Sequence, residues 1–154
     1  MSRVPPKIRR RVIDRAGHRC EYCGLAQESQ EASFHVDHIL PRVAGGKTRL
    51  DNLAFACVSC SLRKEARRSA RDSETGRTVP LYHPRRQLWS DHFRWDHVTV
   101  IGKTATGRAT VAALKLNRPL ILASVSKESI GAATHHFEAD CRDASTAIQL
   151  APRG

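Results

Sequence analysis

The sequence predicts a small α+β protein that is held together by a metal site. Two Cys-x-x-Cys pairs, Cys20 with Cys23 and Cys57 with Cys60, supply four thiolates, the ligand set that tetrahedral zinc prefers. The 33 residues between the pairs contain two short strand-like segments, and helix-like segments flank them. With 154 residues and 40% hydrophobic residues, the chain is of single-domain size and has enough apolar side chains for a modest core.

The first element expected is a helix over residues 6–16. Pro6 suits the first turn of a helix, Ile8 and Val12 belong to an apolar stripe at helical spacing, and Gly17 stands where a C-terminal cap falls. The remaining face is basic because it carries Arg9, Arg10 and Arg15. That face either lies in solvent or contacts phosphate groups, and the sequence leaves both alternatives open.

Two strands and a second helix are expected next. Residues 33–37 alternate as a strand should, which places His35 and Asp37 on one face. A loop with Pro41 and two glycines leads to a second short strand over Leu53–Ala56, and residues 62–70 have the composition of a basic helix.

The second half of the chain is expected to pack on the first. Residues 72–79 read as a connection, residues 95–101 as a strand, and residues 107–117 as a helix capped by Thr106. The division expected is therefore a core over residues 1–71, an α/β packing extension of the same domain over 72–119, and a weakly patterned tail over 120–154 that is disordered or loosely attached. If the tail is dispensable, deletion of residues 124–154 is expected to leave folding and zinc content intact. Two tryptophans of the extension, Trp89 and Trp95, either pack in its core or stack on nucleic-acid bases.

The charge balance favours a polyanionic partner. The formal net charge is +11 and the isoelectric point is about 10.2. Residues 1–71 hold 15 basic and 7 acidic side chains, so the candidate site lies in the more basic half. No membrane span or secretion signal is visible, and the paired cysteines fit a metal site in a reducing cytoplasm, with Cys141 left over as a free thiol.

The segment between the cysteine pairs carries residues suited to phosphodiester hydrolysis. That reaction needs a base to activate water and a divalent cation to neutralise the developing charge. Asp37 offers an oxygen ligand for such a cation, and the imidazole of the adjacent His38 points to another side and can accept a proton near neutral pH.

Several spaced elements occur together in the order found in one family. They are Cys20-x2-Cys23, Asp37-His38-Ile39-x-Pro41, Gly45-Gly46, Asn52-Leu53, Cys57-x2-Cys60 and Lys64. In this respect residues 8–71 resemble the HNH endonucleases that bear zinc knuckles, and later stretches such as 89–95 resemble the extension of small bacterial HNH proteins.

The resemblance implies a ββα-metal (His-Me finger) core with one catalytic Mg²⁺ or Mn²⁺ besides the structural Zn²⁺. By position, Asp37 would be a ligand of the catalytic ion, His38 the general base, and Asn52 the residue that fixes the loop and orients His38. The third motif position, usually His or Asn, is Ser61, which would reach the ion directly or through water. His35 is either a further ligand, a supporting partner, or a histidine bonded to backbone or solvent.

The substrate implied is nucleic acid, expected to be double-stranded DNA. Phosphate contacts are expected from a basic set around the site: Arg42, Lys47, Arg49, Arg63, Lys64, Arg67 and Arg68. Two hypotheses follow. The protein is a metal-dependent HNH endonuclease, or it is a zinc-binding module that binds nucleic acid or a protein partner and has lost catalysis because of Ser61. Oligomeric state and biological role do not follow from the sequence.

Overall fold

The structure, a computed structural model, describes residues 4–119. The helices and strands follow in the order α1 (Pro6–Arg15), β1 (His35–His38), β2 (Leu53–Ala56), α2 (Val58–Lys64), β3 (Ser69–Arg71), β4 (Thr78–Pro80), α3 (Trp89–His92), β5 (Phe93–Asp96), β6 (Thr99–Gly102) and α4 (Ala105–Leu114). Short 3-10 helices lie at Gln27–Ser29, Arg42–Ala44 and Leu50–Asn52. The α+β class expected from the sequence is confirmed.

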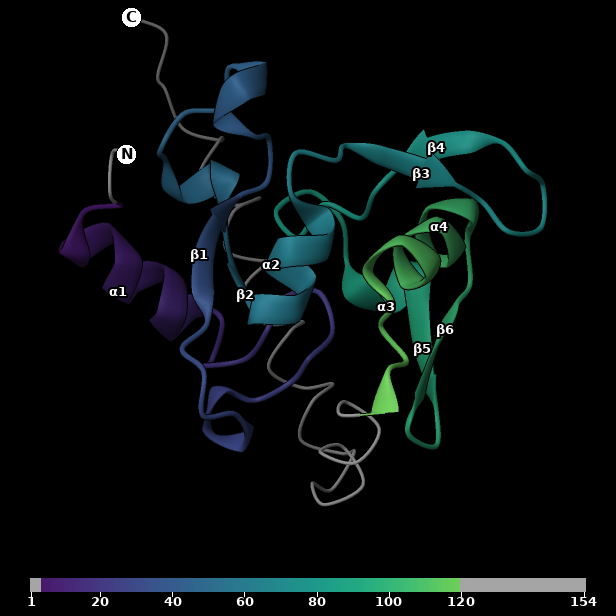
Figure 1. The fold of residues 1–154 in the computed structure, drawn as a ribbon, viewed down its shortest axis with the longest axis horizontal. Helices are drawn as coiled ribbons and strands as arrows, with labels where there is room; N and C mark the ends of the chain where they lie inside the picture. Colours follow the sequence, from purple (N-terminus) through teal and green to yellow (C-terminus); the bar gives the residue numbers. More distant parts are fainter. Residues whose placement is uncertain (1–3, 120–154) are drawn as a thin grey trace, which may run out of the picture.

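The strands form three separate antiparallel pairs, β1 with β2, β3 with β4, and β5 with β6. Helices α1 and α2 both contact the first pair, and α2 also contacts α4, so α2 lies between the β1–β2 pair and the second half of the chain (Figure 1). Because β1, β2 and α2 are consecutive in sequence, the candidate site residues are built on one strand–strand–helix unit.

Helix α1 supports the β1–β2 pair through its arginines. The expected helix is confirmed to within one residue, with Gly17 at a positive φ of 56° after its end. Arg9 donates a hydrogen bond to the carbonyl of Phe34 at 3.1 Å, and Arg15 donates to the carbonyl of Leu53 at 2.8 Å. Two of the three arginines of the basic face are therefore bound to backbone carbonyls.

The helix expected over residues 62–70 is wrong in its bounds. Helix α2 begins at Val58, because the thiol of Cys57 caps it and accepts a hydrogen bond from the backbone N–H of Cys60. It ends at Lys64, since Glu65 has a positive φ of 45° that an α-helix does not tolerate. The residues after it pair with β4 as β3, so tertiary pairing outweighs a helix-forming composition.

The second half also differs from expectation in three places. Residues 95–101 are not one strand but most of a hairpin, which turns at His97 with a positive φ of 53°. The end of the expected connection pairs as β4. The cap of α4 is Thr104 rather than Thr106, because the Thr104 hydroxyl accepts the hydrogen bond of the Gly107 N–H at 3.0 Å.

One hydrophobic cluster joins both halves of the described chain. It contains Val12 of α1, the whole of β2, Phe93 of β5 and Leu114 of α4. The two tryptophans pack against this cluster: Trp89 stacks on Trp95 with ring centroids 5.7 Å apart and donates its indole N–H to the Tyr22 carbonyl. Core packing therefore accounts for the aromatic pair.

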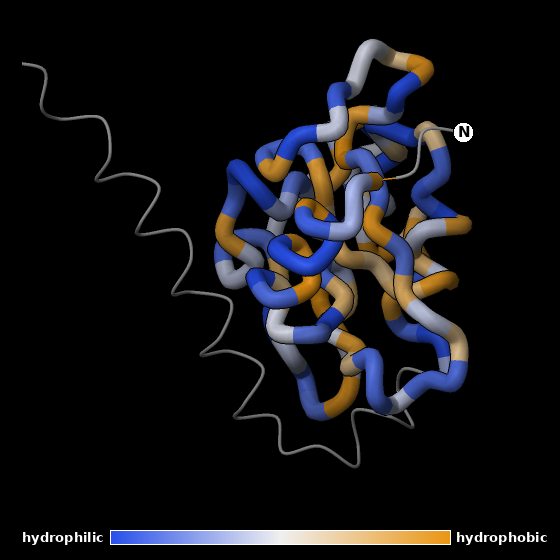
Figure 2. Tube along the Cα trace, turned by 90° about the vertical axis from the view of Figure 1, so that its left-hand side faces the viewer, coloured by the Kyte–Doolittle hydropathy of each residue, from blue (hydrophilic) through white to orange (hydrophobic). Residues whose placement is uncertain are grey.

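Two further expectations concern the C-terminal tail and membrane insertion. The tail over 120–154, and Cys141 within it, lie outside the described residues. Figure 2 shows short hydrophobic segments alternating with hydrophilic ones in the described part, and no helix there is long and apolar enough to cross a bilayer.

Candidate active site

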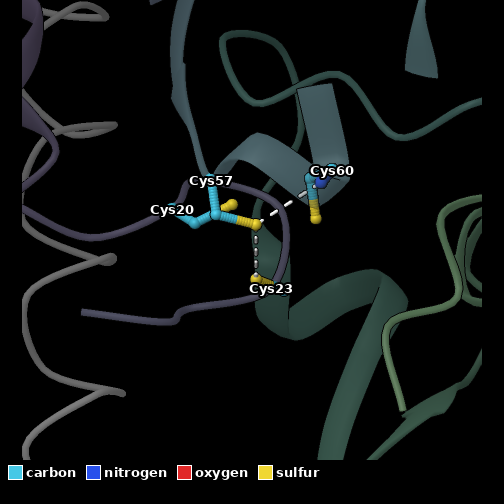
Figure 3. Close-up of side chains that lie close together, drawn as sticks. All are labelled: Cys20, Cys23, Cys57 and Cys60. Atoms are coloured by element: carbon cyan, nitrogen blue, oxygen red, sulfur yellow. Dashed lines mark hydrogen bonds between the residues drawn. The ribbon is translucent and has the colours of Figure 1, made fainter. Parts of the chain in front are cut away.

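Four buried cysteines form the first candidate metal centre. Their sulfur atoms all lie within 4.8 Å of one another and point toward a common centre (Figure 3). Cys23 Sγ and Cys57 Sγ are 3.8 Å apart. That separation matches the distance of about 3.8 Å between two ligands in a tetrahedral site with Zn–S bonds of about 2.3 Å. The four thiols therefore fit one zinc ion.

Local backbone geometry brings the sulfurs together. In the first pair, the chain reverses after Cys23, where Gly24 has a positive φ of 75° and donates its N–H to the Cys20 carbonyl at 2.8 Å. In the second pair, Cys57 precedes α2 and Cys60 lies in its first turn. Burial holds the pKa of the Cys20 thiol well above its usual value, so a bound cation is needed to stabilise the thiolate form.

The strand β1 directs two of the candidate residues toward α2. The ring Nδ1 of His35 is 3.0 Å from the Ser61 hydroxyl, and the charge of Asp37 acts on the ammonium group of Lys64. Ser61 and Lys64 are three residues apart and share a face of α2. His35 and Asp37 therefore face the same side of this helix, as their spacing on the strand predicts.

His38 points away from that pair, toward the loop between the two strands. Its ring Nε2 is hydrogen-bonded to the Thr48 hydroxyl at 2.9 Å, and among residues 4–119 no hydrogen bond engages Nδ1. Burial lowers the pKa of His38, with the positive charge of Arg42 as the next cause. The imidazole is thereby kept neutral near pH 7, with one ring nitrogen fixed and the other available to a proton.

Asn52 fixes the loop that follows His38. Its side-chain oxygen accepts the Leu40 N–H at 2.8 Å, and its amide donates to the carbonyls of Leu40 and Lys47 at 3.1 and 3.0 Å. These are the backbone hydrogen bonds expected of Asn52. Only glycine at position 46 allows this close packing of the loop, because a Cβ there would lie 1.8 Å from the Leu40 carbonyl oxygen.

Lys64 differs from the other basic residues expected to bind phosphate. Its side chain is only 3% exposed, and its ammonium group donates to the His38 carbonyl at 3.0 Å. Burial lowers the pKa of Lys64, although nearby Asp37 opposes the shift. Lys64 therefore holds the backbone of β1 at His38 by a hydrogen bond and adds positive charge near Asp37.

The other basic residues fall into two groups. Lys47, Arg67 and Arg68 line, with Lys64, a pocket of about 560 Å³ beside the candidate site. Arg42, Arg49 and Arg63 are not part of its lining, and Arg49 pairs with Asp51 at 3.3 Å. The fold thus brings four of the seven predicted basic residues to one pocket, and the other three are not part of its lining.

Four residues near the site were not predicted from the sequence: Thr48, Glu21, His83 and Arg86. Thr48 lies in a polar loop, where nothing distinguished it as the partner of His38. Glu21 is a buried carboxylate inside the first cysteine pair that accepts the Phe55 N–H at 2.7 Å and pairs with Arg85 and Arg15. His83 and Arg86 belong to a distant segment that folds back onto the pocket.

Residues 20–67 match the model of the HNH endonuclease family, and this range contains both cysteine pairs and the whole β1–β2–α2 unit. After this match, residues 20–67 are called the HNH domain below. The matched family is one of endonucleases.

A curated relative extends the similarity beyond the HNH domain. The chain is 24% identical over 115 residues to the Septu protein PtuB of Bacillus thuringiensis, in an alignment that covers 73% of this chain and 42% of that protein. The chain therefore spans less than half the length of that relative. No solved structure gives a significant match to the chain.

Proposed function

We propose that this protein is a metal-dependent endonuclease that hydrolyses phosphodiester bonds in DNA, with β1, β2 and α2 as a ββα-metal core. One observation carries the proposal: two adjacent residues of β1 belong to opposite faces of the strand, Asp37 to the face on which His35 contacts α2 and His38 to the face on which it meets Thr48. A carboxylate and an imidazole thus lie on adjacent residues without a hydrogen bond between them, which supports the roles of oxygen ligand for Asp37 and neutral base for His38. They lie within the range that matches a nuclease family.

The donor set beside α2 fits a hard divalent cation. Asp37 offers a carboxylate, Ser61 a hydroxyl, and His35 an imidazole on the same side of the strand. Mg²⁺ or Mn²⁺ would be held by Asp37 with His35 and Ser61, and retained waters would complete its shell. Such an ion, when bound, neutralises negative charge on the phosphate and on the leaving oxygen.

The protein's own residues supply the proton transfer. The free Nδ1 of His38 accepts a proton from the attacking water, while the Thr48 hydroxyl holds the opposite ring nitrogen. Asn52 holds the loop between His38 and Thr48 by its three backbone hydrogen bonds. A zinc ion held by the four thiolates would have no open position for a substrate, and it would join the two ends of the HNH domain.

A plasmid-nicking assay tests this function. Supercoiled DNA is incubated with the zinc-loaded protein and Mg²⁺ or Mn²⁺, and the His38→Asn variant is compared with His97→Asn. Asn at position 38 cannot serve as a base near pH 7, whereas His97 is exposed in the β5–β6 turn. Nicking is expected from the unmodified protein and from His97→Asn and is expected to be lost in His38→Asn.

Two results would contradict the proposal. Equal nicking by both variants would exclude His38 as the base. Absence of nicking by the unmodified protein across metals, with DNA binding retained, would favour a zinc-binding nucleic-acid module instead. Ser61→Asn is the companion variant, because a large gain in its nicking rate would show that Ser61 limits the catalytic ion.

A further inference from the structure

The pocket beside the candidate active site joins the HNH domain to the segment that follows β4. Its walls come from the loop after β1, from the end of α2 and the residues after it, and from residues 80–87. The basic side chains on these walls are Lys47, Lys64, Arg67, Arg68, His83 and Arg86. His83 and Arg86 lie outside the matched family range, so the second half of the chain contributes to this surface.

The positive charge of the pocket has little compensation within the protein. Among residues 4–119, no carboxylate lies within ion-pair distance of Arg67, Arg68 or Arg86. The acidic residue of the lining, Asp51, pairs with Arg49 instead. The pKa of His83 is lowered by burial and, next, by the charge of Arg86. Clustered charges of one sign in a concave surface attract an ion of the opposite sign.

The far wall of the pocket is held rigidly. Leu81 donates its N–H to the Arg68 carbonyl at 3.0 Å, which ties this wall to the residues after α2. The turn beyond it is closed by Gln87, whose side-chain oxygen accepts the His83 N–H at 2.8 Å, while Arg86 donates its own N–H to the His83 carbonyl. Arg86 therefore projects from a fixed turn rather than from a loose loop.

Part of the remaining lining is apolar, including Leu40, Leu81 and Tyr82, and part is polar, including Asn52 and Gln87. A volume of about 560 Å³ is in the range of pockets that hold a small organic group, and a lining with both apolar and basic side chains matches the two halves of a nucleotide. The base and sugar suit the apolar part, and the phosphate suits the basic part.

The pocket is continuous with the backbone that carries the candidate base. Lys64 lines the pocket and donates to the His38 carbonyl, and Asn52 lines it and holds Leu40. We propose that the pocket binds a nucleotide of the substrate strand next to the cleaved phosphate. This inference rests on the proposed nuclease function. Arg67, Arg68 and Arg86 bind its phosphate, and Arg86 is the contribution of the second half of the chain.

Binding of a labelled DNA strand tests the assignment without requiring cleavage. Fluorescence anisotropy is measured in the zinc-loaded His38→Asn protein at several salt concentrations, and Arg86→Ala and Arg94→Ala are added separately. Arg94 is exposed on β5 and outside the pocket lining, so this control removes the same charge elsewhere. Arg86→Ala is expected to weaken binding about tenfold, as for one charged hydrogen bond, and to reduce the salt slope by about 0.7. Arg94→Ala is expected to change neither.

Three outcomes would overturn the pocket assignment. These are unchanged binding in Arg86→Ala, an equal loss in Arg94→Ala, and binding of free thymidine 5′-monophosphate as tight as that of the strand. Failure of the nuclease proposal is distinguishable from these results. A protein that binds DNA through Arg86 and does not nick it contradicts the enzyme alone, and a protein that nicks DNA with no contribution from Arg86 contradicts the pocket alone.

Discussion

The ring of His35 is hydrogen-bonded to the hydroxyl of Ser61, with 3.0 Å between Nδ1 and Oγ. This contact joins β1 to α2 at the position where the resemblance to HNH endonucleases leads one to expect a metal-binding His or Asn. The serine is short, but it holds an imidazole that lies on the same side of the strand as Asp37. On the proposed function, the imidazole of His35 would supply the metal ligand expected of residue 61.

Loss of the Ser61 hydroxyl is expected to weaken binding of the catalytic ion. Ser61→Ala removes the hydrogen bond that orients His35, and such supporting contacts typically contribute about 10- to 100-fold to metal affinity. Mn²⁺ titration of the zinc-loaded protein, followed by electron paramagnetic resonance, measures the effect. Ser59→Ala, in the same helix, is the control and is expected to leave the affinity unchanged. Equal Mn²⁺ affinities in the two variants would show that His35 needs no help from Ser61.

Thr48→Val is expected to lower the nicking rate by about 10- to 100-fold, because the imidazole of His38 loses the hydroxyl that fixes it. Thr48→Ser keeps the hydroxyl and is expected to restore most of the rate. Thermal unfolding of both variants serves as the structural readout and is expected to agree with that of the unmodified protein. A positioning role for Thr48 is ruled out if the serine variant is as slow as the valine variant.

One zinc ion per chain is expected, and its removal is expected to unfold the described domain. Four buried thiols in one place lose their common partner when a chelator takes the metal, and binding of structural zinc is coupled to folding. Zinc content by atomic absorption and circular dichroism give the two readouts. Cys60→Ser is expected to lose zinc and helical signal, whereas Cys141→Ser is expected to keep both. Zinc retention by Cys60→Ser would contradict the four-cysteine site.

Gly46→Ala is expected to destabilise the loop around His38 by several kcal/mol, because the new Cβ would overlap the Leu40 carbonyl oxygen. Gly45→Ala is the matched variant: its Cβ meets nothing within 4 Å, so only its positive φ of 86° is strained, at a cost of about 1–2 kcal/mol. Urea unfolding of both proteins measures the difference. A smaller loss for Gly46→Ala than for Gly45→Ala would show that the loop can move away from Leu40.

Short-range patterns predicted the elements that depend on neighbouring residues. Helix α1 and strand β2 lie where the sequence placed them, since an apolar stripe and a short hydrophobic run suffice to define them. The bounds of α2 and the β5–β6 hairpin were missed for the opposite reason. Helix α2 starts where it does because Cys57 caps it, and β3 exists because residues 78–80 pair with it. The sequence of residues 62–70 by itself shows neither the cap at Cys57 nor the pairing with residues 78–80.

The sequence by itself determined the four-cysteine site and the position of Asp37 and His38 between its halves, because both depend on residue type and on spacing along the chain. Tertiary structure alone decided what those residues contact. It brought Ser61 to His35, Thr48 to His38, and the buried Lys64 beneath β1. It also folded residues 80–87 onto the HNH domain to complete a basic pocket. These contacts link segments that are distant in sequence, and their energies arise only when packing removes both partners from water together.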